Sequence, residues 1–229
     1  MSQPRAAYIH VPFCRHHCGY CNFTVLAGRD DLQDAYLDAV EIELESLRSP
    51  KAVDTLYVGG GTPTHLTPRA LNRLMELLVR WLPINADGEW SIEANPVSVD
   101  RSTFQLLRSY GVTRVSLGVQ SFDSKKLALL ERDHGETEIR RAFDLARDIF
   151  DSVSFDLIFA VPGETPLQWK NDLRAAVELA PDHVSTYGLT LEKGAKFWGR
   201  WRRGKLEPVD DETQRVMYED AIDYLVAQG

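Results

Sequence analysis

The stretch Val153–Ala160 reads VSFDLIFA, an apolar run interrupted only by Ser154 and Asp156. Its short length and its aromatic and β-branched residues are typical of a strand. A nearly continuous apolar run indicates a strand in a parallel sheet that helices cover on one or both faces. The stretch therefore predicts an α/β fold.

Similar runs recur on both sides of this stretch and alternate with helical patterns. The other five expected strands are Ala6–Val11, Thr55–Val58, Trp90–Ala94, Arg114–Val119 and Val184–Leu191. Between them, apolar residues recur at three- and four-residue spacing, as in Leu71, Leu74, Met75 and Leu78. The βαβα order over residues 1–229 predicts one domain with a parallel sheet, whose ligand lies at the carboxyl ends of the strands.

Capping residues mark where two of the helices begin. Thr67 and Thr165 each stand as an N-cap before a proline at the first helical position, and Gln168 completes a capping box with Thr165. The last helical pattern, Asp211–Ala227, runs to the end of the sequence. We therefore expect the natural chain to continue.

The composition argues against two classes of partner. With 26 Lys and Arg against 34 Asp and Glu, the net charge is −8, whereas a general attraction to nucleic-acid phosphates needs a positive surface. No apolar run approaches the roughly 20 residues that span a bilayer, and the N-terminus has no apolar signal core. We expect a cytoplasmic protein with no membrane span and no nucleic-acid partner.

All three cysteines, Cys14, Cys18 and Cys21, fall within eight residues just after the first expected strand. An odd, clustered set does not form a disulfide framework and indicates metal or redox chemistry. A 4Fe-4S cluster usually takes four cysteines, so three would leave one iron able to bind a small ligand. A closed zinc site of three cysteines and one histidine is the alternative. The candidate histidines are His10, His16 and His17.

Glycines and polar residues on other expected strands point to a ligand at the same edge of the sheet. The run Gly59–Thr62 ends the second strand, and its glycines would let the backbone approach a ligand closely. It matches neither a P-loop nor a dinucleotide fingerprint, and a tight turn without a ligand is the alternative reading of the glycines. Glu93, Gln120 and Asp156 come from three further strands, where a polar group needs a partner or a ligand. Hydrogen-bonded residues of the core are the alternative reading.

Three further features carry weaker signals. The basic and aromatic segment Lys196–Lys205 could meet anionic groups, but we expect a solvated loop. His65 and His183 are expected to be ordinary loop residues.

Five motifs together resemble one known family over the whole chain. CxxxCxYC is followed in order by GGGTPT, IEANP, SLGVQSF and DLIFAVPGET, which is similar to the coproporphyrinogen III oxidase-like branch of the radical S-adenosylmethionine (SAM) superfamily. The resemblance implies a six-stranded partial barrel of the (β/α)6 type. It also implies a 4Fe-4S cluster on Cys14, Cys18 and Cys21, with SAM bound to the fourth iron through its amino and carboxylate groups.

The resemblance assigns nine residues to the SAM side of the site. They are Tyr8, Tyr20, Gly60, Gly61, Thr62, Glu93, Gln120, Arg132 and Asp156. The implied chemistry is reductive cleavage of SAM, with an electron from a donor such as a flavodoxin or ferredoxin. The fragment formed takes hydrogen from a substrate, and a barrel mouth would exclude water from it.

Within this branch two functions stay open. The oxidases that decarboxylate coproporphyrinogen III typically have a fourth cysteine two places after the third, where this sequence has Phe23. The run Arg132-Asp133-His134 is more similar to the heme chaperones of the branch. The resemblance therefore favours a chaperone that binds heme and delivers it to an accepting protein, with oxidation of a porphyrinogen as the alternative. The C-terminal heme-binding domain of such chaperones would follow Gly229.

Overall fold

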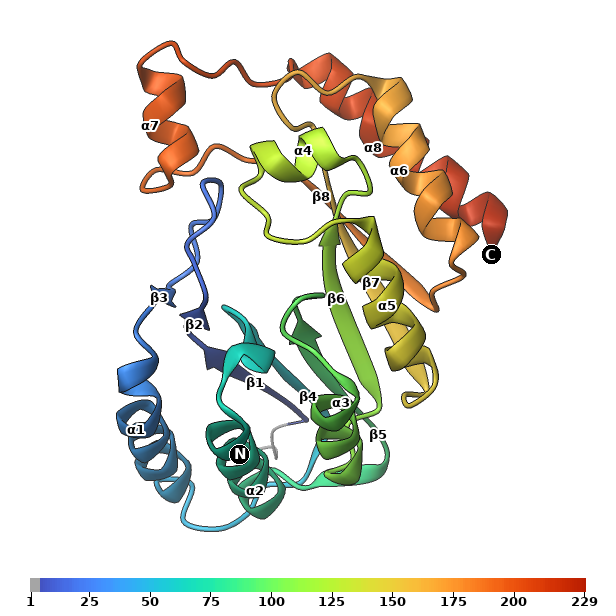
Figure 1. The fold of residues 1–229 in the computed structure, drawn as a ribbon. Coiled ribbons are helices and arrows are strands. Elements are labelled where there is room, and N and C mark those ends of the chain that lie inside the picture. Colours follow the sequence, from blue (N-terminus) through green and yellow to red (C-terminus); the bar gives the residue numbers. More distant parts are fainter. Residues whose placement is uncertain (1–4) are drawn as a thin grey trace. The chain divides into compact units, whose positions relative to one another are not determined.

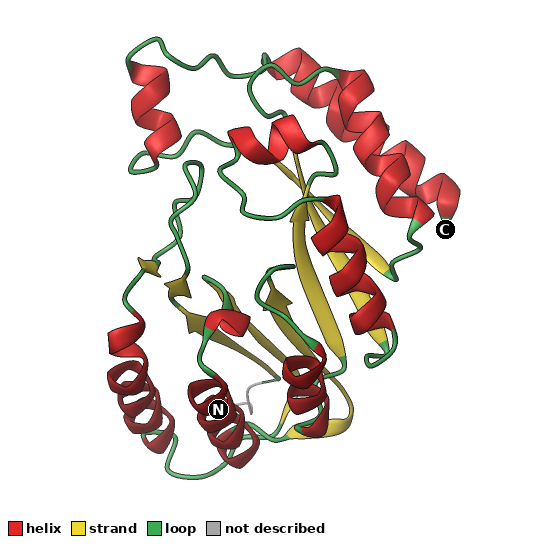
Figure 2. Ribbon diagram, in the orientation of Figure 1, coloured by secondary structure: helices red, strands yellow, loops and turns green. Residues whose placement is uncertain are grey.

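The computed structural model describes residues 5–229, which form two compact units. Among these residues the first unit takes 5–17, Phe23–Ser116 and Ala142–Val153, and the second takes Cys18–Asn22, Leu117–Arg141 and Ser154–Gly229. The sheet order is β1-β4-β5-β6-β7-β8 (Figure 1 and Figure 2). Because neighbouring strands also follow one another along the chain, with helices between them, the predicted α/β fold is confirmed.

In the first unit, β1 pairs in parallel with β4, and β4 pairs in parallel with β5. The elements of this unit are β1 (Ala6–Val11), β2 (Phe13–Cys14), β3 (Leu26–Ala27), η1 (Asp30–Leu32), α1 (Gln33–Glu45), β4 (Val53–Gly60), η2 (Pro63–His65), α2 (Pro68–Trp81), β5 (Ile84–Ala94) and α3 (Arg101–Ser109). It also holds the first residues of β6 (Arg114–Gln120) and β7 (Ser152–Phe159) and the end of α5 (Glu136–Arg147). Since Val11 pairs with Gly60, the cysteine loop and the glycine run leave the sheet together.

Helix α2 begins where the sequence predicts. The Thr67 hydroxyl accepts a hydrogen bond from the Ala70 N–H at 3.3 Å, which confirms the N-cap. The apolar residues at helical spacing are all buried, namely Leu71, Leu74, Met75 and Leu78. Most helical stability comes from packing such a stripe against the rest of the protein.

In the second unit, β7 pairs in parallel with β8. The elements of this unit are the end of β6, α4 (Ser124–Leu129), the start of α5, most of β7, α6 (Pro166–Glu178), β8 (His183–Gly188), α7 (Lys196–Arg202) and α8 (Asp211–Gln228). The predicted capping box of Thr165 and Gln168 starts α6 and is confirmed. Helix α8 lies along α6 (Figure 1), where the buried Trp169 indole N–H donates to the Met217 carbonyl at 2.8 Å.

All six predicted strands are present, although some of their ends differ. Strand β5 begins at Ile84 instead of Trp90, and β8 ends at Gly188 instead of Leu191. The short pair β2 and β3 was not predicted, because strands of two residues leave no periodicity to detect.

Three loop predictions are wrong in whole or in part. Of the expected solvated loop Lys196–Lys205, residues Lys196–Arg202 form α7 with Phe197 fully buried, whereas residues 203–205 are non-helical and exposed as expected. His65 ends η2, where its Nε2 lies 3.0 Å from Oδ1 of Asp30. His183 is the first residue of β8, because its backbone pairs in register with Ser154.

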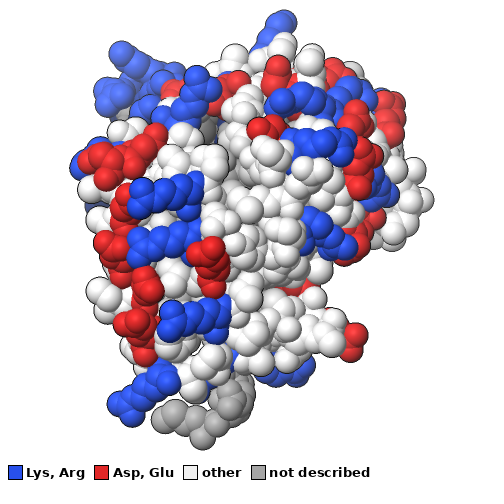
Figure 3. Space-filling view, turned by 60° about the horizontal axis from the view of Figure 1, so that its bottom comes forward, with Lys and Arg blue, Asp and Glu red and all other residues white. Residues whose placement is uncertain are grey.

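The surface carries charges of both signs. Acidic and basic side chains interleave over much of the face drawn in Figure 3. Arg73 joins α1 to α2 in this way, with Nη2 2.7 Å from Asp38 and 2.8 Å from Glu41. Of the helices formed by residues 5–229, none combines the length and apolar character required to cross a bilayer.

Candidate functional site

Cys14 lies beside the glycine run that ends β4. Its Sγ is 3.6 Å from the Thr62 hydroxyl oxygen. The Thr62 N–H donates to the Phe13 carbonyl at 2.8 Å, and the Gly61 N–H donates to the Val11 carbonyl at 2.8 Å. These two backbone bonds hold the glycine run against the start of the cysteine loop. The structure therefore brings together Cys14, Gly61 and Thr62.

The glycines of this run are required by the protein's own packing. A Cβ on Gly60 would lie 2.5 Å from Nδ1 of His10, and one on Gly61 would lie 2.7 Å from the Phe13 carbonyl oxygen. Gly60 also has a φ of +111°, which L side chains rarely adopt. The sequence left open whether these glycines serve a ligand or a tight turn, and these contacts show that the turn itself requires them. A side chain at Gly60 would disturb this loop with or without a ligand.

Glu93 stands near the end of β5 and supports the same turn. Its Oε1 accepts from the Tyr57 hydroxyl at 2.9 Å, and its Oε2 accepts from the Gly60 N–H at 3.1 Å. A Cβ on Gly59 would lie 2.7 Å from Oε1 of Glu93. The half-buried carboxylate thus has the partners that burial demands. No motif had marked Tyr57 as part of this site.

His10 uses both ring nitrogens inside the first unit. Its Nε2 lies 2.8 Å from the Thr24 carbonyl oxygen, which can only accept, so Nε2 carries the proton. In the neutral ring, Nδ1 then accepts from the Tyr8 hydroxyl at 3.1 Å. Burial, followed by the charge of Glu93, raises the pKa of Tyr8, so this hydroxyl stays protonated at neutral pH. His10, a candidate zinc ligand by sequence, is already engaged at both nitrogens.

In the second unit, Cys18 is buried beside a cation. Its Sγ lies 4.0 Å from Nη1 of Arg132 and 3.8 Å from the Glu131 carbonyl oxygen. Burial raises the pKa of the Cys18 thiol, and Arg132 opposes this by favouring the thiolate. Cys21 follows in the same turn, with its N–H donating to the Cys18 carbonyl at 3.2 Å. Because metals bind thiolates, Arg132 favours the form of Cys18 that a metal needs.

The turn after α4 directs Arg132 towards β6. Glu131 has a φ of +58°, and the Arg132 N–H donates back to the Leu127 carbonyl at 3.0 Å. Nη2 of Arg132 donates to the Gly118 carbonyl at 2.9 Å, while its buried Nε has no hydrogen-bond partner within residues 5–229. A buried donor left without a partner is unusual in proteins. An added polar ligand could satisfy it.

His134 is buried just beyond Arg132. Its Nε2 lies 2.8 Å from the Val119 carbonyl oxygen and therefore donates, while its buried Nδ1 has no partner in the described part of the chain. Burial, followed by the charge of Arg132, lowers the pKa of His134 to about 4. His134 is consequently a neutral donor to β6 at pH 7.

Helix α7 anchors the part of the cysteine loop that belongs to the second unit. The Phe197 N–H donates to the Gly19 carbonyl at 2.8 Å. A Cβ on Gly19 would lie 2.5 Å from the Phe197 ring, so glycine is needed there. Tyr20 packs edge-on against Phe197, with 6.4 Å between the ring centroids, and burial raises its pKa. The structure thus shows Tyr20 in a packing contact with α7.

Gln120 closes β6 in a strained conformation. Its φ is +66°, which few residues with a side chain adopt. The next two residues are held by Asp172 of α6. The Ser121 hydroxyl donates to Oδ2 of Asp172 at 2.7 Å, and the Phe122 N–H donates to Oδ1 at 2.7 Å. These bonds fix the turn in which Gln120 sits.

Lys126 neutralises the charge of Asp172 in a buried network that the sequence did not reveal. Its Nζ lies 2.9 Å from Oδ2 of Asp172 and also pairs with Glu164. The side chains of these three residues are at most 6% exposed. Ser121 and Glu164 belong to recognised motifs, but Asp172 carried no signal, because an acidic residue on an amphipathic helix is normally expected to face solvent.

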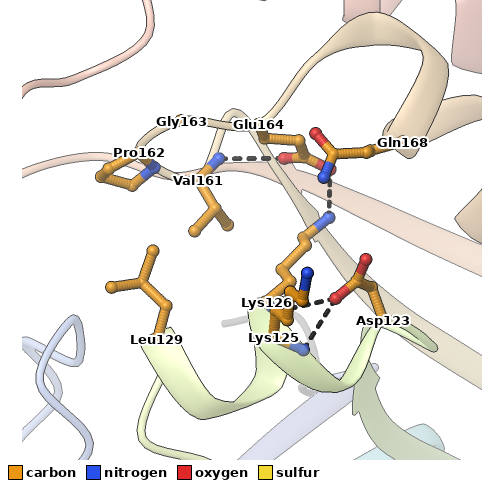
Figure 4. Close-up of a pocket in the computed structure, with 9 residues that line it drawn as sticks. All are labelled: Asp123, Lys125, Lys126, Leu129, Val161, Pro162, Gly163, Glu164 and Gln168. Carbon is orange, nitrogen blue, oxygen red and sulfur yellow. Dashed lines mark hydrogen bonds and ion pairs between the residues drawn. The ribbon is translucent and has the colours of Figure 1, made fainter.

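A pocket of about 170 Å³ opens between α4 and the loop after β7, with Lys126 and Glu164 in its wall (Figure 4). It is lined by Asp123, Lys125, Lys126, Leu129, Val161, Pro162, Gly163, Glu164 and Gln168. The predicted site residues do not line it. Asp156 lies half-buried within β7, in register with Ser185 of β8.

The three cysteines are divided between the two units. Cys14 belongs to the first, and Cys18 and Cys21 belong to the second. None of the three is in a disulfide. Within residues 5–229, no group of three or more His, Cys, Asp or Glu side chains is arranged as a metal site. The convergence of the three thiolates therefore stays a prediction.

Comparisons with known proteins agree with the motifs. Residues 8–176 match the radical SAM superfamily. The chain is 34% identical to the heme chaperone HemW of Bacillus subtilis over 98% of its length, and 35% and 39% identical to those of Escherichia coli and Mycobacterium tuberculosis over 99%. It covers 61%, 60% and 60% of these proteins. The chain thus spans about three fifths of the length of the curated relatives it matches.

Solved structures show the same relationship. Coproporphyrinogen III oxidase (HemN) from Escherichia coli, described as a radical SAM enzyme, matches with a TM-score of 0.86 at 31% identity, over 99% of this chain and 53% of that one. The protein anSMEcpe with bound AdoMet shares the fold, with a TM-score of 0.58 at 19% identity over 83% of this chain and 54% of that one. The predicted barrel of the radical SAM type is confirmed.

Proposed function

Because the chain belongs to the radical SAM superfamily, we propose that residues 1–229 are the cluster- and SAM-binding part of a longer heme chaperone. The observation that carries this proposal is the identity of 34–39% to heme chaperones over nearly the whole chain. The complete protein would bind heme and pass it to an accepting protein.

In this proposal Cys14, Cys18 and Cys21 hold a 4Fe-4S cluster. The donor set fits, since thiolates are the usual ligands of such clusters and none of the three is in a disulfide. Arg132 lies beside Cys18 and has a buried N–H without a partner among the described residues, which an anionic ligand would satisfy. When bound, the cluster would supply one electron to SAM and an open iron for its amino and carboxylate groups.

SAM would lie against the glycine run and the neighbouring strand ends. The proposed SAM residues are Tyr8, Tyr20, Gly60, Gly61, Thr62, Glu93, Gln120, Arg132 and Asp156. Two of the backbone turns concerned are held in place by hydrogen bonds within the protein. Glu93 accepts the Gly60 N–H, and Asp172 holds the turn after Gln120. Such preorganisation lowers the conformational entropy that is lost when a ligand binds, because the loops are already ordered.

Oxidation of a porphyrinogen is the second candidate function. It is supported by the TM-score of 0.86 to coproporphyrinogen III oxidase. Against it stands Phe23, which occupies the position of the fourth cysteine typical of those oxidases and is 66% exposed. A phenyl ring cannot supply a thiol. We therefore prefer the chaperone.

The proposal includes three partners and a location. Heme or a porphyrinogen would be the small-molecule partner, and a flavodoxin or ferredoxin would reduce the cluster. A heme-accepting protein would take the cargo. The cytoplasm is the proposed location, because a reducing compartment keeps the three thiols available.

One assay separates the two functions. The complete natural protein is reconstituted anaerobically and incubated with SAM, reductant and coproporphyrinogen III, and a parallel sample is titrated with heme. We expect stable heme uptake and no decarboxylation. Formation of protoporphyrinogen at enzymatic turnover would favour the oxidase instead.

The cluster has its own test. Cys14→Ala, Cys18→Ala and Cys21→Ala should each lose the intact 4Fe-4S absorption after reconstitution with iron and sulfide, because each change removes one of three ligands. Far-UV circular dichroism should stay close to that of the parent. A variant that keeps a full cluster and normal SAM binding would contradict the assignment, and a parent with zinc but no cluster would favour the zinc alternative.

A further inference from the structure

Helix α7 and the residues just after it form a strongly basic segment. Five of the 26 Lys and Arg residues fall within positions 196–205, where no Asp or Glu occurs. They are Lys196, Arg200, Arg202, Arg203 and Lys205. The chain as a whole has a net charge of −8, so this segment has the opposite sign to the rest of the protein.

Ion pairs within the second unit neutralise part of this charge. Lys196 and Arg200 share Glu131, with their nitrogens 3.2 Å and 2.7 Å from its carboxylate oxygens. The other three cations, Arg202, Arg203 and Lys205, are exposed. The positive charge of these three side chains is therefore directed to solvent.

Two tryptophans lie among these cations. Trp201 is 40% exposed, and the guanidinium carbon of Arg202 lies 5.7 Å from the ring centroid of Trp198. A group of basic side chains also gathers at the upper left of Figure 3, the side on which Figure 1 shows α7. Tryptophan and arginine are enriched among the residues that dominate binding at protein interfaces. The segment thus has the composition of a docking surface for a protein.

The buried side of α7 holds the cysteine loop. The Phe197 N–H donates to the carbonyl of Gly19, which directly follows Cys18. Glu131, the carboxylate that pairs with α7, places its backbone carbonyl oxygen 3.8 Å from Sγ of Cys18. A protein docked on the exposed side of α7 would therefore be separated from the Cys18 turn by a single helix.

We propose that Trp201, Arg202, Arg203 and Lys205, the α7 docking surface, receive an acidic electron-carrier protein of the flavodoxin class. This inference rests on the proposed function, since it requires a cluster on the cysteine loop. One electron leaves the reduced flavin of the carrier and enters the oxidised cluster, with no bond formed or broken. Opposite charges steer such encounters and accelerate association by roughly 10 to 10³-fold at low salt.

The test measures reduction of the reconstituted, full-length protein by an acidic flavodoxin in anaerobic stopped flow. The variant Arg202→Glu/Arg203→Glu/Lys205→Glu should lower the second-order rate constant at least tenfold at low ionic strength. The limiting rate at saturating flavodoxin should change much less, because docking is affected and the cluster is not. For the parent, the rate constant should fall as NaCl is added, whereas for the variant, whose reversed charges repel the carrier, it should not fall.

Two controls keep the outcomes distinct. The variant Lys51→Glu/Arg69→Glu/Arg80→Glu changes the net charge equally on the first unit and should keep the parental rate. Dithionite, a small reductant, should reduce all three proteins at similar rates, which shows that the cluster itself is present. A parental rate in the α7 variant, or an equal loss in the charge-matched control, would overturn the docking surface. Failure of dithionite to reduce the parent would instead count against the cluster.

Discussion

Residues with positive φ mark the ends of three strands. Gly60 ends β4, Gln120 ends β6 and Ala160 follows β7, with φ values of +111°, +66° and +60°. Glycine adopts this conformation without strain, whereas the other two hold it only because their surroundings fix them. Such strain collects at functional sites. In each unit these residues lie at the carboxyl ends of strands, where ligands of parallel sheets usually bind.

The Gly60 turn allows a prediction about packing. Gly60→Ala should lower the free energy of unfolding by about 1–3 kcal/mol, because its Cβ would meet His10 at a strained φ. Gly28 has a φ of +66°, and the Cβ of an alanine there would have no atom within 4 Å. Gly28→Ala is therefore the control for strain without a clash and should lose less stability. Urea unfolding of the cluster-free chain measures both.

A double-mutant cycle isolates the contact itself. His10→Ala should relieve part of the loss in Gly60→Ala, because it removes the ring that the new methyl group meets. Strictly additive losses would show that the clash is not the cause. If a Gly60 variant fails to bind SAM, this cycle shows whether the clash with His10, which disturbs the loop, is the cause.

His134 predicts a pH dependence of stability. Its pKa is lowered from 6.5 to about 4 in the folded protein, so between these values the unfolded chain takes up a proton that the folded chain does not. Stability is therefore lost as pH falls from 6.5 towards 4, by roughly 3 kcal/mol. In His134→Gln the amide can still donate but does not titrate, so this loss should shrink. The urea midpoints of the parent and of His134→Gln, measured from pH 4 to 6.5, test this prediction. If both midpoints change equally with pH, His134 is not the cause.

At the scale of elements, the α4–α6 contact rests on buried charge. Asp172→Ala should lower the free energy of unfolding by about 3–5 kcal/mol, because Lys126 would lose one of its two carboxylates in a buried site. Asp172→Asn should lose less, since its carbonyl oxygen can still accept from Ser121 or Phe122. Asn171→Ala, on the exposed side of the same helix, should change stability by about 0.5 kcal/mol or less. Denaturant unfolding measures the free energy of unfolding of each variant, provided that the m-values of all variants are equal. Equal losses in Asp172→Ala and Asn171→Ala would contradict a stabilising role for the buried charge.

Helix α7 shows how one element can be misread from sequence. Its aromatic residues Phe197, Trp198 and Trp201 stand at helical spacing, but its seven residues are too few for this spacing to repeat. A single buried residue, Phe197, and its backbone bond to Gly19 determine where it lies. These partners are far apart in the sequence, so local pattern could not reveal them.

At the scale of the whole molecule, the proposed function predicts that heme binds mainly outside residues 1–229. Residues 1–229 alone should bind the cluster and SAM but take up heme at least tenfold more weakly than the complete natural protein, because the heme-binding part is proposed to follow Gly229. Heme titrations followed by visible absorption compare the two. Equal affinity would place the heme site within residues 1–229 and contradict this division.

The sequence by itself determined the α/β fold, the six strands and the start of two helices, because periodicity and capping act over a few neighbouring residues. It also determined the family, because the spacing of the cysteine and glycine motifs is local. Only the tertiary structure decided that Glu93 supports the Gly60 turn, that Asp172 holds the turn at Gln120, and that α7 anchors Gly19. Each of these contacts joins residues far apart in the sequence, and burial and hydrogen-bond pairing over such separations depend on how the strands and helices pack.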